Sequence, residues 1–141
     1  MTFPLMNDCL FCKIIRGEIP AAKVYEDEHT LAFLDIKPVN PGHTLVVPKT
    51  HAVGIADASD DALAAVVRVV KKIAPGILAA VGADGYNIGV NQGPIAGQLV
   101  MHLHVHVMPR FPNDGHKLWH GTEASTEDRL ALAEKIRANL S

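Results

Sequence analysis

The most constraining feature of this chain is the stretch HLHVHVM (residues 102–108), in which histidine alternates with leucine or valine. Successive side chains of a β-strand point to opposite faces of a sheet, so residues at every second position share a face. The pattern predicts a strand with an apolar face toward the core and a second face that carries His102, His104 and His106. That second face must look into a polar site.

Three interpretations fit this histidine column. A strand whose solvent face happens to carry histidine is the first, and a hydrolase site in which two or three imidazoles bind catalytic zinc is the second. The third is chemistry of histidine itself, since a neutral imidazole with a pKa of about 6.5 is a competent nucleophile or general acid and base near pH 7. The column by itself leaves all three open.

The loop NQGPIAGQ (91–98) directly precedes the column. Gly93 and Gly97 permit a tight backbone that can offer N–H groups, and Asn91 and Gln98 add neutral donors, so the loop can hold a phosphate. A net charge of −2 gives no field that would gather nucleic acid or an anionic membrane, so a phosphate would be held locally. The alternative is an ordinary connection between strands.

The rest of the chain reads as alternating helices and strands. A helix that begins at Ser59 should be kinked or ended early by Pro75, because proline removes a helical hydrogen bond. The predicted elements, in order, are a short helix in 9–20, strands at 23–27, 30–36 and 43–49, a helix at 59–78, a strand at 86–91, the histidine strand, and a helix at 125–139. This order predicts an α+β fold with an antiparallel sheet of about five strands and packed helices.

Length and composition predict a single globular domain spanning residues 1–141. Hydrophobic residues make up 48% of the 141 residues and charged residues 20%. The N-terminus lacks the pattern of a secretory signal, and charged residues interrupt the longest apolar helix, so we expect a cytoplasmic protein without a membrane partner.

Both cysteines lie in CLFC, as Cys9 and Cys12. This spacing is too local for a disulfide framework and is typical of a metal site or a redox pair. A thioredoxin-like redox role needs a strand before the first cysteine, and none is predicted there. A metal site and two buried thiols therefore remain as the main alternatives.

The histidine segment NQGPIAGQLVMHLHVHVMPR, together with FCKIIRGEIP, AFLDIKPVNPGHTLVVPKTH and DGYNIGVNQG, closely resembles the histidine triad (HIT) family. The resemblance covers about residues 9–111, leaving 112–141 as a C-terminal loop and helix. It implies a HIT-like fold whose sheet continues across a homodimer. It also implies an enzyme that transfers or hydrolyses nucleotidyl groups.

The resemblance assigns the chemistry to three histidines. His104 would attack the α-phosphorus of a purine nucleoside phosphoramidate or related nucleotide, forming a nucleotidyl-histidine that water hydrolyses to an AMP-type product. His106 and His43 would hold the site, and no catalytic cofactor is expected. By the same resemblance the substrate-binding residues are Leu10, Phe11, Ile14 and Phe33 around the base, Asp35 at the ribose, and Asn91, Gly97 and Gln98 at the phosphate.

Some bacterial-type members of the family bind a structural zinc ion, and their ligands fall on Cys9, Cys12, His51 and His102 of this chain. Such a Cys2His2 set is a closed tetrahedron with no open position for catalysis. The resemblance therefore implies one structural zinc per chain. It gives His102 a different role from His104.

Two departures from the family pattern keep other functions open. Leu99 stands where the phosphoramidase branch carries serine or threonine, and the segment FPNDGHKLWHG does not match that branch, so Trp119 receives no role beyond that of a surface aromatic. A dinucleoside polyphosphate hydrolase, which shares the loop form, is one alternative. A non-catalytic purine-nucleotide-binding regulatory module is another.

Overall fold

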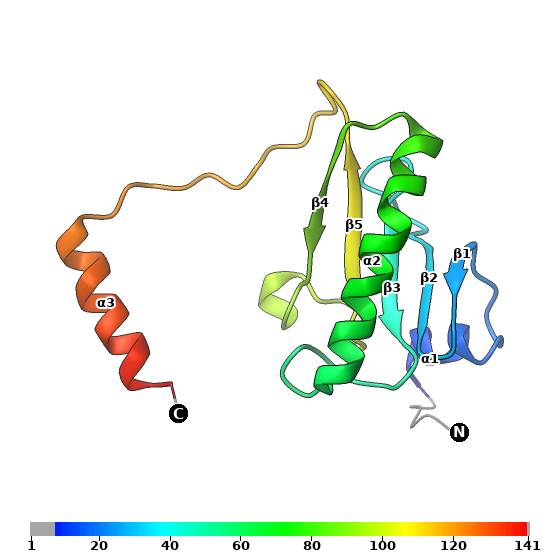
Figure 1. Cartoon of the computed structure of the whole chain (residues 1–141), viewed down its shortest axis with the longest axis horizontal. Helices are drawn as coiled ribbons and strands as arrows, with labels where there is room; N and C mark the ends of the chain where they lie inside the picture. The colour runs from blue at the N-terminus through cyan, green and yellow to red at the C-terminus, as the bar shows by residue number, and fades with distance from the viewer. Residues whose placement is uncertain (1–7, 141) are drawn as a thin grey trace.

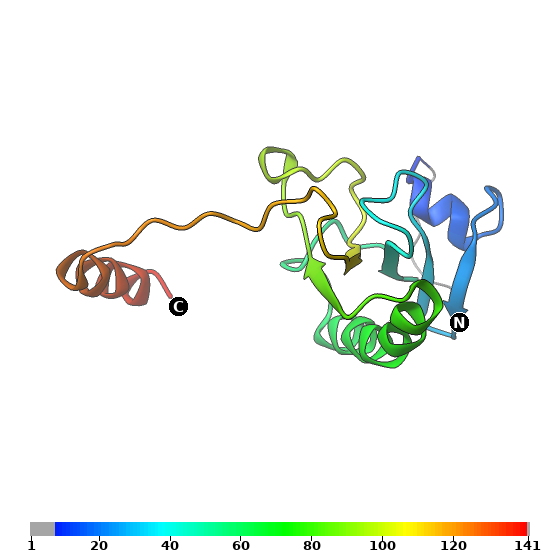
Figure 2. The ribbon, with the colours of Figure 1, turned by 90° about the horizontal axis from the view of Figure 1, so that it is seen from above.

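The structure is a computed structural model that describes residues 8–140, and its centre is a five-stranded antiparallel sheet with the order β1-β2-β3-β5-β4. Helix α2 covers one face of the sheet, and α1 lies on the opposite face (Figure 1; Figure 2). The strands are β1 (Lys23–Glu26), β2 (Thr30–Leu34), β3 (Thr44–Pro48), β4 (Gly85–Gly89) and β5 (Val105–Arg110). The helices are α1 (Leu10–Ile15), α2 (Asp60–Val81), the short 3-10 helix η1 (Pro94–Ala96) and α3 (Thr126–Ala138). The predicted α+β class is confirmed.

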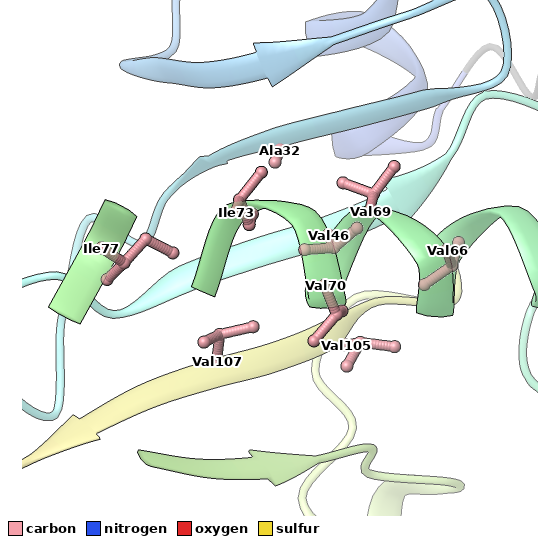
Figure 3. Packing of buried hydrophobic residues seen from close by; sticks show 9 residues of the cluster. All are labelled: Ala32, Val46, Val66, Val69, Val70, Ile73, Ile77, Val105 and Val107. Atoms are coloured by element: carbon pink, nitrogen blue, oxygen red, sulfur yellow. The ribbon is translucent and has the colours of Figure 1, made fainter. Parts of the chain in front are cut away.

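The strands have a different apolar core on each face, because alternate side chains point to opposite sides. On the α2 face, Val105 and Val107 of β5 pack beneath Val66 and Val70 of the helix (Figure 3). On the α1 face, buried residues of β2 and β3 meet the helix: Phe11, Ile14, Leu31, Phe33, Leu45 and Val47. The histidines belong to the α1 side, as the alternation predicts.

Helix α2 begins where the sequence predicts, with the Ser59 hydroxyl accepting a hydrogen bond from the Ala62 N–H at 3.1 Å. The expectation that Pro75 ends the helix early is wrong, because the helix continues to Val81 and ends at Gly82. Proline removes only one hydrogen bond, and the apolar face of α2 continues past it to the buried Ile77. Packing on the sheet outweighs the local penalty.

The predicted strand over 102–108 is corrected at its start, because β5 begins only at Val105. The last pair between β3 and β5 is Val46 with Val105. Before that pair, the Leu103 N–H leaves the ladder and donates to the Ala52 carbonyl at 2.7 Å. His102 therefore belongs to a loop, where its ring is free of the strand alternation.

The turn into β3 requires glycine at position 42. Gly42 has φ of 90°, a left-handed conformation that side chains disfavour. A Cβ there would lie 3.1 Å from Pro109 and from Val81, and 3.2 Å from Ile77. This close approach seats the next residue, His43, in the interior at the start of β3.

After β5 the chain leaves the body as an extended arm (residues 111–125) that leads to α3 (Figure 1). The predicted helix at 125–139 is confirmed, with Ser125 as its N-cap. No described residue of α3 is buried. Within residues 8–140, no helix is long and apolar enough to cross a membrane.

Candidate active site and metal centre

His104 directly precedes β5 and His106 is its second residue, and their ring centroids lie 4.9 Å apart. Phe11 of α1 stands edge-on to His104, with centroids 5.0 Å apart, and leaves that imidazole only 8% exposed. The predicted catalytic pair therefore lies in a mostly buried site between α1 and the sheet.

The protonation of His104 follows from one backbone contact. Its Nδ1 lies 2.7 Å from the carbonyl oxygen of His102. A carbonyl can only accept, so Nδ1 must carry the proton. In the neutral ring, Nε2 then holds a lone pair, which is the form that a nucleophilic imidazole needs.

His106 receives the opposite tautomer through His43. The Val39 N–H donates to Nδ1 of His43 at 3.0 Å, so the neutral His43 ring carries its proton on Nε2. That Nε2 lies 2.9 Å from Nδ1 of His106 and donates to it. His106 is left with an N–H at Nε2, a buried atom that has no hydrogen-bond partner among residues 8–140. This N–H can serve an oxygen of a bound phosphoryl group.

Burial keeps both rings of this pair neutral. Desolvation lowers the pKa of His106 to about 4, and the neighbouring His104 and His43 push in the same direction while Asp35 opposes them. Desolvation also lowers the pKa of His43, again opposed by Asp35. At pH 7 the pair therefore holds the tautomers described above.

A second cluster gathers four side chains from distant segments: Cys9, Cys12, His51 and His102. Three of them are held by local structure. Cys9 is the N-cap of α1 and accepts from the Cys12 N–H, and the buried His102 directs its Nε2 to the Pro48 carbonyl at 2.8 Å. Because that carbonyl can only accept a hydrogen bond, the proton of the neutral His102 ring is on Nε2. The lone pair on Nδ1 therefore faces the two sulfurs and His51.

The geometry of this cluster fits a tetrahedral zinc ion. Nδ1 of His102 lies 3.4 Å from Cys9 Sγ, 3.5 Å from Cys12 Sγ and 3.2 Å from Nδ1 of His51. Nδ1 of His51 lies 3.4 Å from Cys12 Sγ, and all four ligand atoms lie within 4.8 Å of one another. Ligands on a tetrahedron around zinc are separated by about 3.3 to 3.6 Å for N–N and N–S pairs. Two thiol sulfurs and two imidazoles are a typical structural zinc set, and all four predicted ligands meet here.

Asp35, His43 and His106 also bring potential ligand atoms close together. Nε2 of His43 carries a proton and lies 3.6 Å from the Asp35 carboxylate, so it acts as a donor and offers no lone pair to a metal. The Asp35 carboxylate also accepts from the Lys37 N–H at 2.8 Å. Asp35, the residue predicted to bind the ribose, therefore lies beside His43 and His106.

The predicted phosphate loop is braced from within. The Gln98 side chain is buried, donates to the carbonyls of Val53 and Val100, and accepts from the Gly93 N–H. Asn91 donates to the Gly97 carbonyl at 3.4 Å. Both amides hold the loop in shape, and contact with a substrate phosphate stays a prediction.

The four side chains predicted around the base are not gathered in one open slot. Phe11, Ile14 and Phe33 belong to the buried core on the α1 face. Leu10 is 42% exposed and lines a groove of about 390 Å³ with His51 and Leu99. Their role in binding a purine stays a prediction, and three of them have a clear packing role.

The HIT domain profile matches residues 16–113, which is more than half of the chain. The chain belongs to the HIT family. It is 41% identical over 135 residues, 94% of this chain and 98% of the relative, to the adenosine 5'-monophosphoramidase hnt1 of Schizosaccharomyces pombe. It is 44% identical over 110 residues, 78% of this chain and 56% of the relative, to the adenylylsulfatase HINT3 of Arabidopsis thaliana.

Solved HIT structures share the fold. A crystal structure of a Streptococcus mutans protein superposes with a TM-score of 0.90, 44% identity, and coverage of 96% of this chain and 87% of that one. A zinc-bound histidine triad protein from Mycobacterium smegmatis superposes with a TM-score of 0.73 and 41% identity, covering 93% of this chain and 97% of that one. The HIT-like fold is thereby confirmed.

Sequence reasoning missed the backbone groups that set the histidine tautomers of this HIT protein. The carbonyls of Pro48 and His102 and the N–H of Val39 decide which ring nitrogen carries the proton. The segment KPVNPG (37–42) supplies Val39 but contains no predicted site residue. Backbone groups leave no side-chain signal, so only the two prolines around Val39 hinted at a fixed loop.

Proposed function

We propose that this protein hydrolyses purine nucleoside phosphoramidates, or related nucleotides with a good leaving group on the α-phosphorus, through a nucleotidyl intermediate on His104. The observation that carries the proposal is the contact between Nδ1 of His104 and the His102 carbonyl, which leaves Nε2 unprotonated. The name of the fission yeast relative, a monophosphoramidase, supports the substrate class.

In the first step the Nε2 lone pair of His104 attacks phosphorus, the Nε2–P bond forms, and the P–N bond to the leaving amine breaks. The imidazole becomes cationic, and its Nδ1–H then points at the His102 carbonyl, whose partial negative charge stabilises that cation. Nε2–H of His106 donates to a phosphoryl oxygen and offsets its charge.

In the second step water attacks phosphorus, and the bond to His104 breaks. The leaving amine takes its proton from solvent in the first step, and the attacking water returns one to solvent in the second. The products are a nucleoside monophosphate, the amine and the regenerated imidazole. Asp35 would accept from the ribose hydroxyls, because a carboxylate can accept two donors. The reacting groups in this scheme are the substrate, the His104 imidazole and water.

We assign zinc a structural role at Cys9, Cys12, His51 and His102, supported by their spacing and by the zinc-bound relative. Bound zinc would supply a rigid tie between α1, the segment after β3 and the segment before β5. His102 is both a ligand of this set and the residue whose carbonyl orients His104. A structural site thus positions the nucleophile.

Among the described strands β4 is an edge strand of the sheet, and we expect a second copy to pair there. Tyr86 and Ile88 of β4 and Val67 of α2 are exposed around a groove of about 330 Å³. An open edge strand beside an apolar groove is a usual place for strand pairing. Sedimentation should show a dimer that Ile88→Asp weakens, whereas Ile95→Asp, an exposed residue on η1, should leave the dimer intact.

The function is tested with purified full-length protein and an adenosine phosphoramidate. His104→Ala should lower kcat at least about a thousandfold, and the exposed His29→Ala should leave it unchanged. Quenched wild-type protein should carry a nucleotidyl group on the peptide that contains His104. Full turnover by His104→Ala would contradict the mechanism. Tight nucleotide binding without turnover of phosphoramidates, adenylyl sulfate or dinucleoside polyphosphates would favour a regulatory module.

A further inference from the structure

Helix α3 is built as a stable helix, but it lies away from every other helix and strand of residues 8–140 and none of its residues is buried. Ser125 caps its start, acidic residues fill its first turn, and Lys135 and Arg137 lie in its last turn, which complements the helix dipole. A lone helix of this length is nevertheless marginal in water, because most helix stability in proteins comes from packing. Something outside the described body must cover it.

One side of α3 is suited to such a contact. Leu132, Ile136 and Leu140 follow one another at intervals of four residues and form an apolar stripe. They line a shallow groove of about 260 Å³ together with Lys135 and Asn139. Ile136 is 52% exposed and Leu140 is 71% exposed. Nothing in the described part of the chain covers this stripe.

The direction of the arm is fixed at its root. The Asp114 carboxylate accepts from Arg110, from the N–H groups of Phe111 and His116, and from the Asn40 side chain. His116 also donates from Nε2 to the Val39 carbonyl at 2.9 Å. These bonds tie the start of the arm to the β2–β3 loop, so the chain departs from the body in a defined direction.

That direction leads past the free edge of the sheet. Figure 1 and Figure 2 both place α3 beyond β4, on the side away from β1. A second copy that pairs at β4 would occupy the same side of the molecule. The arm would then lie along that copy.

The Streptococcus mutans crystal structure supports a fixed position. Residues 111–141 are 31 of the 141 residues, so the body alone could not give a TM-score of 0.90 over 96% of the chain. The arm and α3 must superpose as well. A relative with 44% identity thus holds the helix away from its own body in the same place.

We propose that α3 is exchanged between two copies of this chain, so that the stripe of Leu132, Ile136 and Leu140 packs on the body of the second copy. The occupant of the stripe is a second copy because the arm is aimed across the edge where that copy pairs. The exchange adds an apolar contact to the strand pairing at β4. This assembly is independent of the chemistry proposed for His104.

The first test measures self-association of full-length variants by sedimentation. Ile136→Glu should raise the dimer dissociation constant at least tenfold. Leu130→Glu, which alters the same helix away from the stripe, should change it less than threefold. Glutamate is a good helix former, so intrinsic helicity does not explain a difference. Equal effects of the two substitutions, or no effect of Ile136→Glu, would overturn the exchange.

The second test identifies the surface that covers α3. An equimolar mixture of carbon-13-labelled and unlabelled full-length chains is analysed by isotope-filtered NOE spectroscopy. Intermolecular NOEs from the methyl groups of Ile136 and Leu140 to methyl groups of the body would support the proposal. NOEs only within one chain, or only between two α3 helices, would overturn it even if the β4 edges pair.

Discussion

Nε2 of His43 donates a hydrogen bond to Nδ1 of His106 over 2.9 Å, at the centre of the site. His43 comes from the start of β3, and His106 from β5, its neighbour in the sheet. Because the Val39 N–H donates to Nδ1 of His43, the proton of His43 is on Nε2, and its donation to Nδ1 of His106 places the His106 proton on Nε2. Four predictions follow from this site and its surroundings.

Replacing His43 should lower kcat most when both of its hydrogen bonds, to the Val39 N–H and to His106, are lost. His43→Leu removes both hydrogen bonds and should lower kcat by about a hundredfold, the usual range for a positioned proton donor. His43→Gln can accept from Val39 and donate to His106, so it should retain more activity. Steady-state kinetics with a phosphoramidate measures both. Equal activity of the two variants would show that the proton position on His106 does not matter.

The zinc set predicts a structural metal. Wild-type protein should contain about one zinc per chain, and Cys12→Ser should lose it and several kcal/mol of stability, lowering Tm by about 10 °C or more. Metal analysis and thermal unfolding provide the measurements. A chelator that abolishes turnover while Tm is unchanged would instead indicate a catalytic metal.

Acid should destabilise the protein through His106. Its folded pKa of about 4 lies below the ordinary value of 6.5, so the unfolded state binds the proton first as the pH falls. Its contribution to stability is therefore complete above pH 6.5 and is lost progressively toward pH 4. Asparagine does not titrate, so His106→Asn lacks this pH-dependent loss of stability. Between pH 7 and pH 4 the Tm of the wild type should therefore fall more than the Tm of the variant. The exposed control His29→Asn should show a Tm difference from wild type that does not change with pH. The same constancy for His106→Asn would contradict the burial of His106.

Gly42→Ala should destabilise the fold by about 1–3 kcal/mol, because a Cβ at φ of 90° is strained and would crowd Pro109, Val81 and Ile77. Chemical denaturation measures the loss. Gly76→Ala is the matched control, since no atom lies within 4 Å of its added Cβ and alanine favours helix. Equal stability of the two variants would show that the turn before His43 tolerates a side chain.

Most of the architecture could be predicted from local patterns. The apolar runs of β2 and β3, the alternation in β5, and the Ser59 and Ser125 caps of α2 and α3 are signals that neighbouring residues supply. Two local expectations were wrong for a tertiary reason. Packing on the sheet carries α2 through Pro75, and the Leu103 contact with Ala52 delays the start of β5 until Val105.

The sequence by itself determined which chemical groups are present and that the histidines face away from the apolar core. The alternation alone leaves the three imidazoles equivalent, and the family resemblance that gives them different roles says nothing about the protons on their ring nitrogens. The tertiary structure makes them different. The Pro48 carbonyl accepts from Nε2 of His102, so the lone pair of that ring faces the cysteines. The His102 carbonyl accepts from Nδ1 of His104, which leaves the lone pair on Nε2. His43 donates to Nδ1 of His106, so His106 carries its own proton on Nε2 and can donate it in a hydrogen bond. Each distinction depends on a backbone group brought close by folding, and a carbonyl or an N–H allows only one tautomer of the ring it meets.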